Sequence, residues 1–179
     1  MNRVTSGKIL PLLFALTILI AGMSPGLSDI MHRAPSSIGT GRAGVFLAEG
    51  SDGEEAGLSI DADSNHAVFK GMAGWPNATR FYEDSIRIRN DDQTTGTVEL
   101  MFDSWSGSVT KLTVSVRVFD ANGRQKGYTI HVGESGSSTG PIMMMSRETC
   151  RVQWELKWTA EATTADKATI LLRLSTKVE

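Results

Sequence analysis

Cysteine and histidine are scarce in this sequence of 179 residues, which holds one cysteine, Cys150, and three histidines. A single cysteine excludes an internal disulfide, so the stability of the fold must come from its core or from assembly with other chains. The cysteine and the histidines do not show the spacing of a zinc site. Cys150 falls on the apolar side of an alternating run, where we expect a free thiol to pack as a small hydrophobic residue.

Basic clusters and the common catalytic motifs are also missing. The 18 basic and 20 acidic residues give a net charge of −2. No stretch concentrates Lys or Arg, which argues against nucleic acid or an anionic membrane surface as a partner. The sequence has no G-x-S-x-G, P-loop or H-E-x-x-H motif and no defensible Ser/His/Asp arrangement. We therefore predict a protein that is not an enzyme and has no cofactor.

Helical periodicity is nearly absent beyond residue 28, and an alternation of apolar and polar residues takes its place. The clearest case is CRVQWELKW (150–158), in which every second residue is apolar. Because successive strand residues point to opposite faces, each such run predicts a strand with one inward face. In the other runs the predicted inward residues are Leu112, Val114, Val116, Val118, Tyr128, Ile130, Val132, Ile170, Leu172 and Leu174.

The alternating runs predict about nine short strands, joined by segments rich in Gly, Ser, Asn and Asp. Asn122-Gly123 marks a hairpin, because these residues tolerate the positive φ of tight β-turns. Residues 62–80 are predicted to be mostly irregular, and 161–168 to form a long loop. One polar and one apolar face per strand is typical of an antiparallel β-sandwich. The predicted fold is therefore all-β, a jelly-roll-like sandwich in a single domain at 43–179.

The N-terminal segment 1–28 has the layout of a secretory signal. Arg3 and Lys8 precede an uncharged apolar run at 9–23, which is the order of a signal peptide. No clear small-residue cleavage site follows, so an uncleaved signal anchor is the alternative. The charge-free stretch 9–28 has the length of a membrane-spanning helix. Either reading predicts an extracellular or cell-surface protein, and the second adds the membrane as a partner.

A polar block, 90–95, interrupts two of the alternating runs. It is predicted to be a turn between two sandwich strands, since Asx-rich turns form for backbone reasons alone. The alternative is a small acidic site in which Asp91 and Asp92 join Asp120 across one end of the sandwich and hold a metal ion. The run 143–145, three methionines, does not predict a copper site, because its side chains point to opposite faces. We expect that run to pack in the core.

Three further residues are candidates for surface recognition. Asn77 begins an N-x-T acceptor triplet, which can be glycosylated on an exported chain. Trp75 and Trp105 are predicted to lie in loops rather than on core faces. There they either bind a glycan or a partner, or cap an end of the sandwich.

The run FYEDSIRIRN (81–90) fits an F-x-x-D-x-I-x-I-x-N block, and a polar turn, T-V-E-L and V-S-V-R-V follow it. Together with the hydrophobic N-terminal segment and the short apolar strand AGVFLA (43–48), these motifs resemble the TasA/camelysin-like exported β-sandwich proteins and their archaeal relatives. The resemblance covers roughly residues 43–118 and the terminal strand. It implies a jelly-roll sandwich and, in several members, filaments assembled by strand donation, with residues 27–47 as the donor segment.

Two functional hypotheses follow from these observations. The first is an exported, non-enzymatic structural protein, secreted or at the cell surface, which self-associates as a filament subunit. The alternative is a membrane-anchored surface binding module that recognises a glycan, an ion or a protein through its loops. The polar segment 29–42 is a flexible tether in one reading and part of the donor segment in the other.

Overall fold

The computed structural model describes residues 44–177, which form ten β-strands and one short 3-10 turn, η1 (Val109–Lys111). The predicted signal segment 1–28 and the tether or donor segment 29–42 lie outside the described residues. Within 44–177, no helix has the length and apolar character needed to span a membrane.

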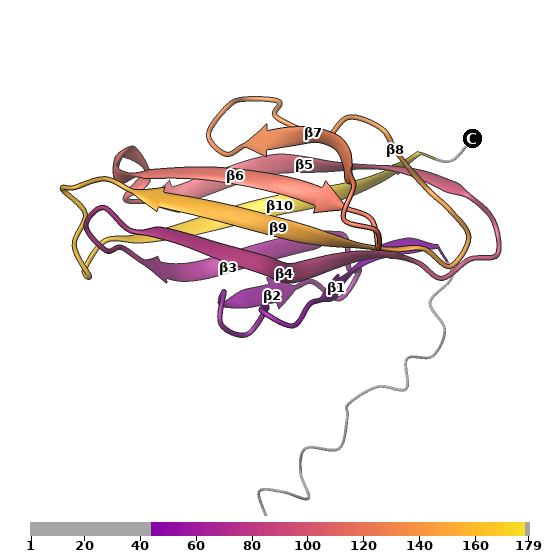
Figure 1. Cartoon of the computed structure of the whole chain (residues 1–179), viewed down its shortest axis with the longest axis horizontal. Coiled ribbons are helices and arrows are strands. Elements are labelled where there is room, and N and C mark those ends of the chain that lie inside the picture. The colour runs from indigo at the N-terminus through magenta and orange to yellow at the C-terminus, as the bar shows by residue number, and fades with distance from the viewer. Residues whose placement is uncertain (1–43, 178–179) are drawn as a thin grey trace, which may run out of the picture. The chain divides into compact units, whose positions relative to one another are not determined.

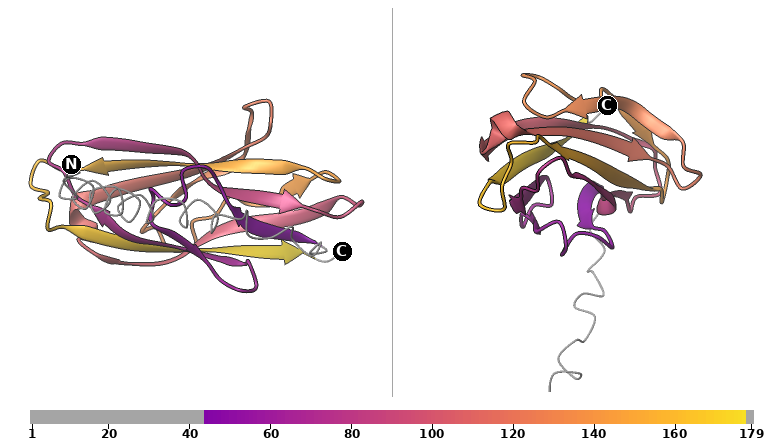
Figure 2. Two further views of the ribbon diagram at one scale, coloured as in Figure 1. Left: turned by 90° about the horizontal axis from the view of Figure 1, so that it is seen from below. Right: turned by 60° about the vertical axis from the view of Figure 1, so that its left-hand side comes forward.

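The strands form two antiparallel five-stranded sheets that pack as a β-sandwich, which confirms the predicted fold (Figure 1). Sheet A has the order β1 (Val45–Glu49), β4 (Thr79–Asn90), β9 (Thr149–Trp158), β6 (Leu112–Phe119) and β7 (Gln125–His131). Sheet B has the order β2 (Leu58–Ile60), β3 (His66–Ala73), β10 (Lys167–Lys177), β5 (Gly96–Gly107) and β8 (Ile142–Met144). Figure 2 shows the two layers from two further directions.

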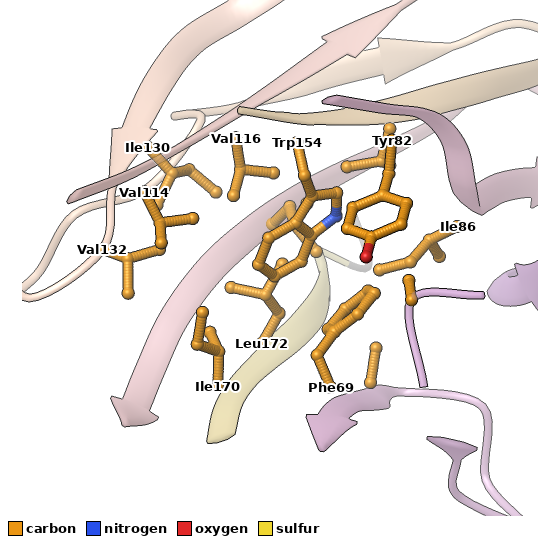
Figure 3. Packing of buried hydrophobic residues seen from close by; sticks show 14 of the residues in the cluster. Phe69, Tyr82, Ile86, Val114, Val116, Ile130, Val132, Trp154, Ile170 and Leu172 are labelled. Atoms are coloured by element: carbon orange, nitrogen blue, oxygen red, sulfur yellow. The ribbon is translucent and has the colours of Figure 1, made fainter. Parts of the chain in front are cut away.

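The core lies between the sheets and is centred on Trp154 of β9 (Figure 3). Its indole ring packs against Phe69 of β3 with ring centroids 4.0 Å apart, so one aromatic pair joins the two sheets. Figure 3 also shows Tyr82 beside the indole and Ile170 and Leu172 below it. The Trp154 Nε1 is the one buried side-chain nitrogen or oxygen without a hydrogen-bond partner in the described part of the chain. The Trp154 side chain therefore stabilises the core by packing and not through a hydrogen bond.

Alternation predicts the buried faces of β6, β9 and β10 correctly. In each strand the apolar residue of every pair is buried and its neighbour is more exposed. Other segments differ from prediction. Within 62–80 the chain forms β3, an eight-residue strand paired with both β2 and β10. The methionine run packs only partly in the core, because Met144 is buried while Met143 and Met145 are exposed.

Tyr128 does not point inward as predicted; its side chain is 75% exposed. The pairing of β6 with β7 shifts register between Val116 and Val118, which is a β-bulge. Gly127 lies at this bulge with a φ of +70°. Three residues of β7, 127–129, stand here against the single β6 residue 117. Tyr128 lies in this unpaired stretch, so its side chain turns outward while Ile130 stays in the core.

The polar block 90–95 is a turn built around Asn90, which is 1% exposed. The Asn90 side-chain amide donates to the backbone carbonyls of Thr94, Met144 and Met145 at 2.8, 3.3 and 2.9 Å. Its Oδ1 accepts from the Asp92 backbone amide at 3.0 Å. Since Asn90 ends β4 in sheet A and Met144 belongs to β8 in sheet B, one buried amide fixes the turn and joins the two sheets.

Candidate functional site

Trp75 and Asn77 lie in the turn between β3 and β4, as the sequence predicts. The Trp75 side chain is 53% exposed. Asn77 is also exposed and has a φ of +55°, and its backbone amide donates to the Thr159 carbonyl at 3.2 Å. The backbone of this turn is therefore fixed to the β9–β10 connection, while the Asn77 side chain faces solvent.

Trp105 is not in a loop. It belongs to β5, opposite Ile170 of β10, and is half-buried against the core. It contacts Phe102 edge to face, with centroids 6.3 Å apart and rings at 87°. A Cβ at Gly133 would stand 2.6 Å from the indole ring, so the absence of a side chain there makes room for it. Trp105 thus serves packing on sheet B.

Two of the three acidic candidates of the predicted metal site, Asp91 and Asp120, use their carboxylates for other contacts, and Asp92 is held through its backbone. Arg89 Nη2 lies 3.1 Å from Asp91 Oδ1 in an ion pair. The Asp92 backbone carbonyl accepts from the Arg147 amide at 3.2 Å. Asp120 Oδ1 accepts from the Asn122 and Arg124 backbone amides at 2.8 and 2.9 Å. Across residues 44–177, no group of three or more His, Cys, Asp or Glu side chains is placed to hold a metal ion.

The structure brings Asp120 instead to a pocket on the outer face of sheet A, with a volume of about 590 Å³. We call it the arginine pocket. Its floor is contributed by β4 and β9, and its wall is the β6–β7 turn. The lining residues are Asp84, Arg87, Asp120, Ala121, Asn122, Gly123, Thr149 and Arg151.

The β6–β7 turn stands over the face of the sheet. Figure 1 shows it reaching from the end of β6 across β9, and the left view of Figure 2 shows it rising from its layer. Asp120 stabilises the turn through the two amides that it accepts, and Gly123 adopts a φ of +78° that closes it. The predicted Asn-Gly hairpin is therefore confirmed, and it forms a wall of the pocket.

Two arginines lie directly opposite each other on the floor. Arg87 of β4 pairs in register with Arg151 of β9, and both point outward because their neighbours Ile86, Ile88 and Val152 are buried. Like charges directly opposite on adjacent strands destabilise a sheet. Such a pair requires either compensation by carboxylates or a role outside stability.

Arg87 is compensated. Its Nε lies 3.0 Å from both carboxylate oxygens of Asp84, and its Nη2 also donates to Asp84. Burial raises the pKa of Asp84, but the hydrogen bonds from Arg87 and Ser51 outweigh burial and hold the pKa below its usual value of 3.8. The pair is therefore charged at neutral pH, and part of the Asp84 hydrogen-bonding capacity is already used.

Arg151 is compensated only weakly. Its Nη1 stands 3.6 Å from Glu83 Oε2, whose side chain is 66% exposed. Its guanidinium carbon lies 5.7 Å from the centre of the Phe119 ring, which is a cation–π contact. Among the described residues it makes no side-chain hydrogen bond within the limits of normal geometry. The aromatic ring holds the guanidinium in place while its N–H donors stay available.

The sequence signals parts of this pocket but not their assembly. Arg87 and Arg151 fall on the polar faces of two predicted strands, and Asp120 falls in a predicted hairpin. Their meeting depends on the pairing register of β4 with β9, which alternation does not encode. Of the predicted site residues, the pocket includes Asp120 and excludes Trp75, Trp105, Asp91 and Asp92.

Comparisons with known proteins found no matching family model and no matching curated protein. Among solved structures, one chain in the crystal structure of accessory secretory proteins 1, 2 and 3 of Streptococcus pneumoniae matches at 10% identity and a TM-score of 0.29, over 75% of this chain and 95% of that chain. TmCBM61 in complex with β-1,4-galactotriose matches at 6% identity and a TM-score of 0.30, over 74% and 82%. The N-terminal cellulose-binding domain of Cellulomonas fimi β-1,4-glucanase C matches at 16% identity and a TM-score of 0.22, over 76% and 90%. TM-scores this low support no inference about family or ligand.

Proposed function

We propose that this chain is a non-catalytic glycan-binding module of the cell surface, and that it holds its ligand in the arginine pocket. The observation that carries the proposal is the composition of the pocket lining, which holds two Arg and two Asp together with Asn122 and Thr149. Sugar hydroxyls both donate and accept hydrogen bonds. Guanidinium, amide, hydroxyl and carboxylate groups on one surface offer the matching partners.

The shape and rigidity of the pocket support the same function. Its floor consists of paired strands, and rigid elements hold side chains in a fixed geometry better than loops do. The half-buried Phe119 lies beside the floor and offers apolar surface next to the polar groups. The pocket is a broad depression rather than an enclosed cavity, which suits a short segment of a longer polysaccharide.

The cell-surface location that we propose rests on the sequence. The apolar stretch 9–28 supplies either a cleaved signal or an anchor, and both deliver the sandwich to the exterior. The filament hypothesis remains a prediction. Residues 45–47 of the predicted donor segment belong to β1, which pairs with β4 of the same chain at the edge of sheet A. Strand donation would have to exchange this pairing for one with β4 of a neighbouring chain.

Binding of the purified full-length chain to a panel of neutral and acidic polysaccharides tests the proposal. Isothermal titration should detect at least one ligand, and Asn122→Ala together with Arg87→Ala should weaken it by roughly tenfold or more. Arg173→Gln, on the outer face of sheet B, is the matched control and should bind as the wild type does. Binding that survives both pocket changes, or binding to no polysaccharide, would refute the proposal.

A further inference from the structure

We infer that the arginine pocket selects glycans that carry an anionic group, a carboxylate or a sulfate ester, and that Arg151 binds this group. The inference rests on the proposed glycan-binding function and adds the chemical class of the ligand. It follows from which charged side chains of the pocket already have partners within the protein and which do not.

The two carboxylates of the pocket are engaged elsewhere. Asp84 is bound by Arg87 through the Nε and Nη2 donors. Asp120 accepts two backbone amides of its own turn, and the hydrogen bond from the Arg124 amide lowers its pKa. Neither carboxylate forms an ion pair with Arg151. One positive charge of the pocket therefore has no close partner within it.

The nearest carboxylate outside the lining does not change this balance. Glu83 stands 3.6 Å from Arg151 and is mostly exposed to water. An ion pair of this kind contributes little, because water screens it and both side chains must be held in one geometry. An incoming anion in a bidentate arrangement makes two charge-assisted hydrogen bonds to the same guanidinium and displaces Glu83 readily.

The geometry of Arg151 favours a planar or multidentate anion over a hydroxyl. The Phe119 ring fixes the guanidinium from one side at 5.7 Å, so less side-chain freedom is lost when a ligand binds. Arg87 lies directly opposite, so a ligand anion between β4 and β9 also relieves the repulsion between the two arginines. Thr149, at the start of β9, adds a hydroxyl at the same part of the lining.

The experiment compares oligosaccharides of one backbone with and without the anionic group, using the full-length chain. Oligogalacturonate and its carboxyl-reduced or methyl-esterified form make one pair, and a sulfated galactan and its desulfated form make the other. We expect the anionic member of at least one pair to bind roughly ten- to hundredfold more tightly, with a preference that falls as salt is raised. The pair that shows the difference identifies carboxylate or sulfate ester.

Variants then assign the preference to one residue. Arg151→Gln should remove the difference between the two members of the pair while weak binding of the neutral member persists. Arg151→Lys keeps the charge but loses the planar fork, so it should retain only part of the preference. Arg173→Gln should leave the preference intact. Equal binding of both members by the wild type, or a preference that survives Arg151→Gln, would overturn the inference while leaving glycan binding standing; no binding to any glycan would refute the proposed function itself.

Discussion

The outer faces of the two sheets differ in how their arginines are placed, although their inner faces form one shared core. A single row across sheet A holds two arginines in register between an alanine and a phenylalanine; in strand order the row is Ala48, Arg87, Arg151, Phe119 and Gln125. On sheet B, Arg173 of β10 lies between His66 of β3 and Met101 of β5, and no second arginine stands opposite it. A nearby row of sheet B carries no charge; in strand order it is Ser59, Val68, Leu171 and Ser104.

The difference shows what packing does and does not decide. Burial requires apolar residues at every second position of the strands, and the strands of both sheets have them. Packing places no such demand on the outward positions. A pair of opposed arginines on sheet A is therefore an arrangement that stability alone would not select, and it coincides with the face over which the β6–β7 turn rises to form the arginine pocket.

A substitution in the shared core is expected to cause the largest loss of stability, and it affects both sheets. Trp154→Ala should lower the free energy of unfolding by about 3–5 kcal/mol, because Trp154 is fully buried and joins the sheets through Phe69. Urea unfolding followed by circular dichroism measures the change. The exposed Trp75→Ala, which removes the same side chain from a turn, is the control; an equal loss in both variants would contradict the packing described here.

The Asn90 side chain, which joins the two sheets, is expected to give the next largest loss of stability when it is removed. Asn90→Ala should cost about 2–3 kcal/mol, because the backbone carbonyls of Thr94, Met144 and Met145 and the Asp92 backbone amide lose their buried partner. Gln93→Ala, in the same turn but exposed, should change stability by less than about 0.5 kcal/mol. If Asn90→Ala unfolds at the same urea concentration as the wild type, the turn is held by other contacts.

The ion pair on sheet A predicts a pH-dependent difference between the faces. The pKa of Asp84 is lowered in the folded chain from 3.8, so the unfolded chain binds its proton first and the stabilisation is complete above about pH 5. The stabilisation is lost as the pH falls through the lowered pKa. Asp84→Asn should therefore cost roughly 1 kcal/mol at pH 7 and progressively less below pH 4.

Thermal unfolding of wild type and Asp84→Asn from pH 7 to pH 2 measures this prediction. Asp63→Asn, an exposed change in the β2–β3 turn on the side of sheet B, serves as the reference. Parallel curves for wild type and Asp84→Asn would show that Arg87 gains nothing from Asp84.

The smallest expected effect is on the stability of Arg151→Gln. The variant loses the cation–π contact with Phe119 but also the repulsion from Arg87, and these changes oppose each other. Its free energy of unfolding should stay within about 0.5 kcal/mol of the wild type. A larger loss in urea unfolding would indicate that Arg151 is retained for stability, and the contrast between the two faces would weaken.

The sequence predicts the fold well because alternation reports burial residue by residue. In β6 and β9 the apolar set is buried as expected, and the Asn122-Gly123 turn lies where predicted. The prediction fails where pairing overrides local signals. Ser and Gly around Trp105 favour a loop, yet β10 pairs along the whole of β5 and draws the indole into the sandwich.

Tyr128 illustrates a second kind of failure. A bulge at Gly127 changes which face the following residue occupies, and the sequence shows only a glycine inside a strand. The same limit hides the arginine pocket. Alternation places Arg87 and Arg151 on polar faces, but only the three-dimensional register puts them opposite each other. The polar face of a single strand can thus be predicted from the sequence. A site that combines the polar faces of several strands cannot.

The buried thiol makes the chain a reporter of its own opening. Cys150 is the single cysteine of the sequence, and burial, with the charge of Glu148, raises its pKa to about 12. Only the thiolate reacts with alkylating reagents, and β9 lies between β4 and β6, so labelling requires that sheet A separate. The rate of alkylation in native buffer therefore counts rare opening events without any engineered probe.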